Sequence, residues 1–383
     1  MYFLATLALE RKYKKKEYFE NPNFEKFLYI YLFVSVVLNI IHTFSILSLK
    51  DFFVNTTNIF AFFIIYITIK KYGDEGMIKA IYKSLLTICV ISSLVGIYQF
   101  IVDPYFFRIG AERLAFADKL RSNGVFKAEY IQSYFLISGI AVALMTLKSR
   151  ILKYLLVALF LIGIIFAFHR MSWVVTIILF AIYFIKIKKV KILYVTIVAG
   201  IALVMIFFFS SRSFLLVDEF GHSHIVQERL FIDTITFRFN IYRMVLNNIP
   251  KSWLIGFGTP KSDVYYHGML RLGAGEDWAN AERGGLHNGF LHIMFFEGVP
   301  AMILFIIFLL SIIFYFYYLK DKKHIFYFIP FFEVTKFTLS NISNVFPIYG
   351  ELGLLMAISI AVGVVAYRKK IDLNKIMVNY ADT

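Results

Sequence analysis

Long apolar runs recur along almost the whole of this 383-residue chain, and they restrict its possible folds more than any other feature. A helix that crosses the roughly 30 Å hydrocarbon core of a bilayer needs about 20 apolar residues. About ten runs meet or approach this length, and the pattern therefore predicts an all-α, polytopic integral membrane protein with about ten transmembrane helices. The runs lie near residues 27–49, 52–69, 78–102, 128–147, 151–168, 171–187, 191–209, 287–319, 324–340 and 349–367.

The composition excludes a soluble class. The chain is 60% hydrophobic and contains 44 Phe, which is more apolar surface than a soluble domain can bury. Its single cysteine, Cys89, lies inside an apolar run, so we expect no disulfide framework and interpret Cys89 as a packing residue. A net charge of +15 would suggest nucleic-acid binding in a soluble protein. Here the placement of the lysines explains the charge, and no nucleic-acid partner is expected.

The lysines predict the topology, because they cluster in every second connection between the apolar runs. Cytoplasmic loops of membrane proteins carry the excess of basic residues. We therefore expect both chain ends in the cytoplasm and the large loop outside. The predicted regions are a cytoplasmic segment (1–26), seven spans (27–209), a large extracytoplasmic loop with an amphipathic helix (210–286), three spans (287–367) and a cytoplasmic tail (368–383).

Arginine dominates the basic residues of the predicted outer segments, whereas lysine dominates those inside. Any fixed positive charge can set topology, but the planar guanidinium grips phosphate oxygens in two places. The asymmetry therefore indicates an anionic, phosphorylated ligand on the outer side, although solvated loops of accidental composition would look the same. The outer arginines are Arg108, Arg113, Arg121, Arg170, Arg212, Arg229, Arg238, Arg243, Arg271 and Arg283.

The loop 210–286 contains a predicted amphipathic helix that we expect at the outer membrane interface. Apolar residues recur at helical spacing between Gln227 and Asn248, and Pro250 is expected to end the helix. Arg238 and Arg243 fall between the apolar positions. A turn with Trp253 and the glycines of 256–258 follows near the membrane surface. His222 and His224 resemble a metal-ligand pair, but such pairs in polar loops usually bind nothing, and no metal is expected.

The junction between this loop and the next apolar run holds His287 and Asn288. A titratable group at the mouth of an apolar helix is costly to place and often functional. Glu297 lies about 15 Å further along the same helix, too far to contact His287, and is interpreted as a hydrogen-bonding group between helices. Pro300 predicts a kink in the long run 287–319.

Four stretches, in order, resemble the O-antigen ligase and polymerase superfamily of bacterial envelope glycosyltransferases. The resemblance spans roughly residues 120 to 301, and His169 stands where the family more often has serine. The stretches are SNGVF (122–126), FHRMSW (168–173), RFNIYRMVLNNIPKSWLIGFG (238–258) and HNGFLHIMFFEGVPA (287–301).

The resemblance implies transfer of an oligosaccharide from an undecaprenyl diphosphate carrier to an acceptor sugar hydroxyl, without a metal or other cofactor. The reaction would take place on the outer face of the bacterial cytoplasmic membrane. His287 is expected to be the catalytic base, and the other predicted site residues bind substrate: Arg170, Arg238, Arg121, Arg243 and Asn288. The simpler interpretation makes His287 a helix cap and the arginines interfacial. Expected partners are the lipid-linked donor, a glycan acceptor, the bilayer, and other polysaccharide assembly proteins such as a chain-length regulator.

A polymerase that extends a surface polysaccharide is the first choice, and a ligase that attaches the glycan to a lipid or wall acceptor is the second. A transporter or flippase of lipid-linked sugars would carry more charge within its spans. The expected spans contain little charge, which favours an enzyme. Their charged residues are Lys83, Glu129, Glu297, Glu333 and Lys336.

Overall fold

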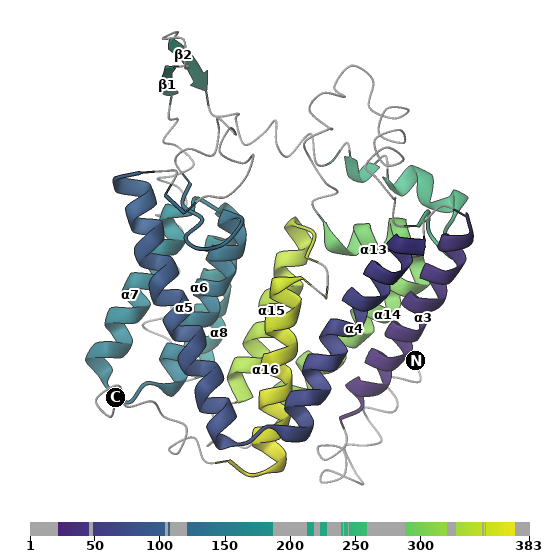
Figure 1. Cartoon of the computed structure of the whole chain (residues 1–383), viewed down its shortest axis with the longest axis horizontal. Helices are drawn as coiled ribbons and strands as arrows, with labels where there is room; N and C mark the ends of the chain where they lie inside the picture. Colours follow the sequence, from purple (N-terminus) through teal and green to yellow (C-terminus); the bar gives the residue numbers. More distant parts are fainter. Residues whose placement is uncertain are drawn as a thin grey trace. The chain divides into compact units, whose positions relative to one another are not determined.

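The computed structural model describes residues 22–45, 49–103, 106–107, 121–186, 213–217, 223–227, 239, 241–243, 245–258, 288–319, 327–346, 348 and 350–371. These residues are predominantly α-helical, which confirms the predicted class (Figure 1). The chain forms two compact units. Unit 1 comprises Met1–Ile81, Asn247–Met269 and Asn288–Thr383, and unit 2 comprises Tyr82–Leu246 and Leu270–His287.

Unit 1 is a helical bundle built from both ends of the chain. Within it α16 packs against α4 and α15, and α14 packs against α3, α13 and α15. The early helices therefore lie beside the late ones, as the purple and green-to-yellow ribbons of Figure 1 show. Its helices are α3 (Phe24–Ser45), α4 (Leu49–Tyr72), α13 (Gly289–Glu297), α14 (Val299–Tyr318), α15 (Phe328–Ser343) and α16 (Glu351–Arg368).

Unit 2 contains most of α5 (Glu75–Ile101), with α6 (Glu129–Thr146), α7 (Arg150–Phe166) and α8 (Arg170–Lys186). Small residues bring its helices close together: a Cβ added at Gly139 of α6 would lie 2.8 Å from the Cys89 sulfur of α5. The Cys89 thiol is buried and donates to the Phe135 carbonyl at 3.3 Å. The predicted packing role of Cys89 is confirmed.

Four helices of the described residues are long and apolar enough to cross a membrane: Phe24–His42, Glu75–Ile101, Val299–Tyr317 and Glu351–Arg368. Helices occupy every expected position except 191–209, which lies outside the described residues. One face of α5 exposes apolar side chains at helical spacing, as expected where a helix faces lipid. The chain is a multi-pass membrane protein, and a total of ten spans stays a prediction. The exposed residues of α5 are Ile88, Ile91, Leu94, Tyr98 and Ile101.

The run 287–319 is two helices, so the prediction of one kinked span was wrong in detail. The break falls at Gly298, which has φ 91° and ψ 167°, a conformation that essentially only glycine adopts. Pro300 stands in the first turn of α14, where its missing N–H is tolerated. The interpretation of Glu297 is confirmed, because its carboxylate accepts a hydrogen bond from Ser35 of α3 at 3.1 Å.

A buried ion pair lies inside α15. Lys336 Nζ contacts Glu333 Oε2 at 2.6 Å, one helical turn away, and both side chains are only 1% exposed. The second oxygen, Glu333 Oε1, has no hydrogen-bond partner. Two opposite charges on neighbouring turns reduce the cost of placing either one in an apolar surrounding.

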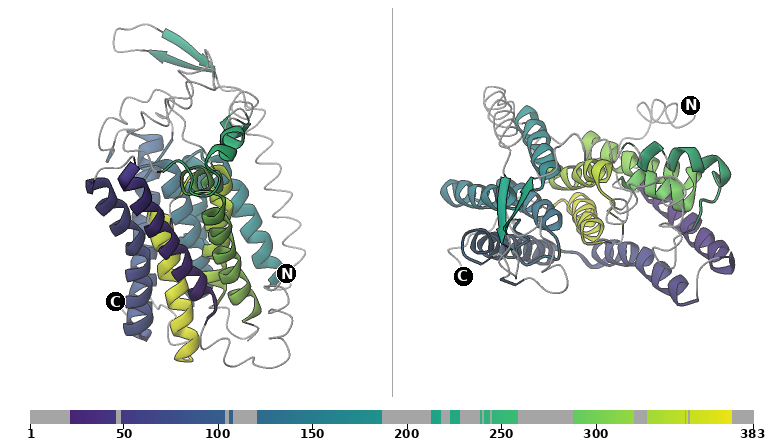
Figure 2. Two further views of the ribbon diagram at one scale, coloured as in Figure 1. Left: turned by 90° about the vertical axis from the view of Figure 1, so that its right-hand side faces the viewer. Right: turned by 90° about the horizontal axis from the view of Figure 1, so that it is seen from above.

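The large loop contains structure that the sequence analysis did not anticipate. Strands β1 (Ser213–Val217) and β2 (Ser223–Gln227) pair antiparallel, with Leu215 opposite Ile225 (Figure 2). Of the two histidines, His224 lies in β2, whereas His222 belongs to the connection 218–222, which lies outside the described residues.

The helix predicted from Gln227 to Asn248 is present over its last turns, but its predicted start was wrong, because Gln227 is the last residue of β2. Residues 241–243 and 245–248 are α-helical, and the chain then tightens into a short 3₁₀ turn, Ile249–Lys251, that contains Pro250. The predicted end of the helix at Pro250 is confirmed. Ile241 and Val245, four residues apart, are buried on one face of this helix.

Candidate functional site

Arg121 lies eight residues before α6 in the chain and contacts the first residue of that helix. Its Nη1 lies 3.5 Å from Glu129 Oε1, and the two side chains are 33% and 22% exposed. Glu129 is also favourably placed, since a carboxylate in the first turn of a helix interacts with the positive end of the helix dipole. A pair this exposed and this long stabilises the fold by less than about 1 kcal/mol. Its effect is to orient the guanidinium at the end of α6.

The turn that carries Arg121 is held by the buried amide of Gln99 in α5. Gln99 Oε1 accepts from the backbone N–H groups of Asn123 at 3.0 Å and Gly124 at 2.9 Å, and its Nε2 donates to the Gly124 carbonyl. Gly124 has φ 57°, and a Cβ there would lie 2.1 Å from the Ser92 hydroxyl oxygen. The predicted Ser-Asn-Gly turn is confirmed. Gln99 itself carries no sequence signal, because an amide within an apolar run does not reveal its partners.

We expect Gln99→Leu to lower the free energy of unfolding by about 1–3 kcal/mol for each backbone N–H left without a partner. The measurement is thermal unfolding of the purified protein in detergent. Leu94→Ala, on an exposed position of the same helix, is the control and should melt close to the parent. A Gln99→Leu protein that melts with the parent would show that the turn is held by other contacts.

His169 caps α8, the helix that begins with Arg170. Its Nδ1 accepts from the Ser172 N–H at 3.2 Å, and the Ser172 hydroxyl donates to the His169 carbonyl at 2.7 Å. An imidazole thus performs the capping that serine performs at other helix starts. With Nδ1 as an acceptor, the neutral ring carries its proton on Nε2. The turn is closed from the other side by Trp173, whose Nε1 donates to the Ile164 carbonyl.

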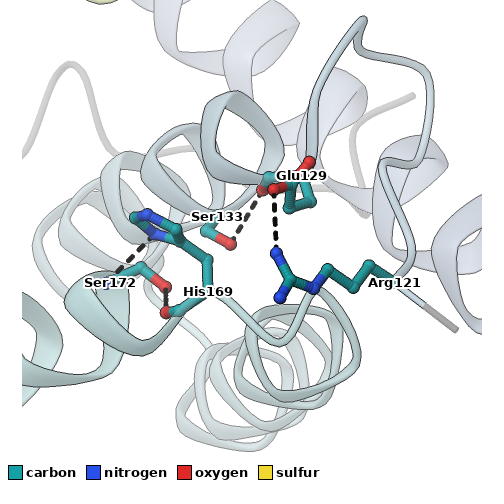
Figure 3. A network of polar contacts seen from close by, with 5 residues as sticks. All are labelled: Arg121, Glu129, Ser133, His169 and Ser172. Carbon is teal, nitrogen blue, oxygen red and sulfur yellow. Dashed lines mark hydrogen bonds and ion pairs between the residues drawn. The ribbon is translucent and has the colours of Figure 1, made fainter. Parts of the chain in front are cut away.

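The ends of α6 and α8 come together in unit 2, as Figure 3 shows. The His169 ring lies 5.5 Å from the Tyr134 ring and 6.1 Å from the Tyr130 ring, both on α6. Tyr130 directly follows Glu129, the partner of Arg121. Two predicted site regions, that of Arg121 and that of Arg170, therefore meet at one end of this bundle. Arg170 is exposed there.

Asn288 is the N-cap of α13. Its Oδ1 accepts from the N–H groups of Phe290 and Leu291, each at 3.0 Å, and its Nδ2 donates to the Ile342 carbonyl at the end of α15. The amide thus fixes the start of α13 in unit 1. The substrate contact predicted for Asn288 stays a prediction beside this structural role.

The remaining predicted residues are placed only in part. Arg243 is exposed on the loop helix, two residues from the buried Ile241. Arg238 and His287 lie outside the described residues, so the predictions for them rest on the sequence. The part of the chain that the structure describes contains no cluster of three His, Cys, Asp or Glu side chains that could hold a metal ion.

Comparison with known proteins gives one family match. A family model described as "O-Antigen ligase" matches residues 154–306. The matched stretch begins in α7 and ends in α14, so it includes the His169 turn, the large loop and α13. Arg121 precedes the match. No curated protein matches the chain.

Proposed function

Because the chain belongs to the O-antigen ligase and polymerase superfamily, we propose that it transfers an oligosaccharide from undecaprenyl diphosphate to an acceptor sugar hydroxyl. The reaction takes place at the outer face of the bacterial cytoplasmic membrane, and its product is a growing surface polysaccharide. The observation that carries the proposal is the family match across residues 154–306, which takes in Arg170, Arg238 and His287. The membrane-spanning helices supply apolar surroundings suited to a polyprenyl tail.

The proposed reaction needs a base and a means of stabilising negative charge. The acceptor oxygen attacks the sugar carbon that is bonded to the carrier phosphate, and that carbon–oxygen bond breaks. The hydroxyl proton passes to His287, since histidine is the side chain best suited to accept and release a proton near neutral pH. The lipid diphosphate departs with the bonding electrons, and Arg170 and Arg238 stabilise the charge that develops on its oxygens. Arg121 and Arg243 are further candidates for this contact.

A defined in vitro assay tests the proposal. Purified protein in detergent is supplied with one lipid-linked oligosaccharide, and the products are separated by size. A ladder of products that lengthens with time is the result expected for a polymerase. Absence of any sugar transfer, from protein that is folded and monodisperse, would contradict the proposal.

The ligase alternative is supported by the description of the matched family, "O-Antigen ligase". A ligase would give a single transfer to a lipid or wall acceptor in place of a ladder. The same assay therefore distinguishes the two when candidate acceptors are added. Transport of the lipid-linked sugar without transfer would appear as carrier movement in vesicles with no new glycosidic product.

The proposed orientation predicts which cysteines an impermeant thiol reagent can reach in spheroplasts. In a Cys89→Ser background, Lys127→Cys should react in intact spheroplasts, and Gly76→Cys should react only after lysis. Both positions are exposed, and a Cβ added at Gly76 would make only an ordinary van der Waals contact, with Asp74 Oδ1 at 3.5 Å. The reverse labelling pattern would place Arg170 and His287 on the cytoplasmic side and overturn the proposed location of the reaction.

A further inference from the structure

Residues Trp253–Gly258 lie against the break between α13 and α14 and complete its hydrogen bonding. In an unbroken helix the Phe295 carbonyl would accept from the N–H of residue 299. Here the Phe295 carbonyl accepts from Phe257 N–H at 2.9 Å, and the Val299 N–H donates to the Trp253 carbonyl at 2.8 Å.

The next carbonyl shows why a partner from outside the helix is needed. The Phe296 carbonyl would bond residue 300 in an unbroken helix, but Pro300 has no N–H. Gly258 N–H supplies the donor at 2.9 Å instead. A break in an apolar helix leaves backbone groups that must find partners within the protein. The segment Trp253–Gly258, which we name the docking segment, provides them.

Glycine is required on both sides of this contact. A Cβ added at Gly256, which has φ 70°, would lie 2.4 Å from the Phe296 carbonyl carbon. A Cβ added at Gly298 would lie 2.5 Å from the Leu254 carbonyl oxygen. Both neighbours are backbone atoms, which cannot rotate away as a flexible side chain could. The two backbones therefore fit only while both positions are glycine.

Helix α3 holds both partners of the contact. His42 Nε2 donates to the Ile255 carbonyl in the docking segment at 2.9 Å. Ser35, two turns earlier on the same face of α3, donates to Glu297 at the end of α13. The far end of α13 is fixed as well, since Asn288 bonds α15 and a Cβ at Gly289 would lie 1.9 Å from the Asn341 side-chain oxygen. A nine-residue helix is marginal alone, so these contacts set the position of α13.

We propose that the docking segment is a positioning element for catalysis: it fixes α13 and its N-cap Asn288, the residue that directly follows His287 in the sequence. This inference rests on the proposed function, in which His287 is the base. The docking segment belongs to the stretch 238–258 and α13 to the stretch 287–301. Two of the four stretches that resemble the family are therefore in contact. Gly256, Gly298 and His42 are positioning residues, because they act through α13.

The test is a double-mutant cycle between Gly298→Ala and His287→Ala, read as kcat and KM for the lipid-linked donor. A displacement of about 1 Å at a catalytic group can cost about 100-fold in rate. Gly298→Ala should therefore lower kcat by about 10–100-fold in the parent, with little change in KM. In the His287→Ala background it should lower kcat by less than about 3-fold, because the base it positions is gone. Gly76→Ala, at an exposed position where the added Cβ would make only an ordinary contact, is the matched control and should keep the parental kcat.

The possible outcomes separate the two proposals. Equal losses from Gly298→Ala in both backgrounds, or no loss in the parent, would overturn the positioning role. Parental activity of His287→Ala alone would instead overturn the assignment of the base. If Gly298→Ala does not give monodisperse protein, His42→Phe serves in its place, since it keeps a ring against Gly258 and removes the bond to Ile255. It should lower kcat in the parent alone, and an equal loss in both backgrounds would again overturn the proposal.

Discussion

His287→Ala is expected to slow sugar transfer by about 10²–10⁴-fold, the usual contribution of a general base. A sugar hydroxyl is a poor nucleophile until its proton is removed, whereas the diphosphate is already a good leaving group. The variant should still insert, fold and bind the lipid-linked donor, because its arginines are unchanged. The loss should therefore appear in kcat, measured with purified protein in detergent and a lipid-linked oligosaccharide.

Asn288→Ala is the neighbouring comparison for this experiment. It removes the cap of α13 and should lower the free energy of unfolding by about 0.5–2 kcal/mol. Its effect on the rate should be smaller than that of His287→Ala. A His287→Ala enzyme within a few-fold of the parental rate would contradict the assignment of the base and leave His287 as a contact to the acceptor or a structural residue.

Arg170→Lys and Arg238→Lys are each expected to lower transfer by about 10–100-fold although both keep the positive charge. Lysine cannot reproduce the two parallel hydrogen bonds that a guanidinium makes to phosphate oxygens. One donor aimed at charge that develops in the reaction can contribute 10²-fold or more, so a weakened contact should be readily measured. Yield and length distribution of the polymer report the effect in cells, and kcat reports it in detergent.

Lys251→Ala provides the control for the arginine variants. Lys251 is exposed at the end of the loop helix and bonds only locally, to Asn248 Oδ1 at 2.9 Å. It should retain parental activity. Arginine-to-lysine variants that make polymer of normal yield and length would assign these arginines to topology or solubility, and the diphosphate contact would lose its main support.

The sequence predicted the structural features that are set by residues close together in the chain. Apolar runs predicted the helices, Pro250 predicted the end of the loop helix, and Ser122–Gly124 predicted a turn. The hairpin of β1 and β2 also carried a signal, because two apolar-rich stretches flank a short connection that contains Gly221.

Features that depend on distant residues could not be predicted in the same way. The break at Gly298 lies between two stretches that are both apolar, so periodicity does not reveal it; only Pro300 hinted at a missing hydrogen bond. Its partners, Trp253 and Phe257, lie some forty residues earlier in the chain. Likewise His42 at the end of an apolar run gave no indication that it would bond the Ile255 carbonyl. These pairings follow from tertiary structure alone.

The buried ion pair of α15 bears on how the protein is assembled during synthesis. A helix that carries Glu333 and Lys336 is poorly suited to lipid when it stands alone, since each charge needs surroundings supplied by protein. α14 and α16 flank α15 in the chain and also pack against it. We therefore expect α15 to leave the translocation channel together with α16, against an α14 that is already in place. The C-terminal helices would then enter the bilayer as one cooperative group.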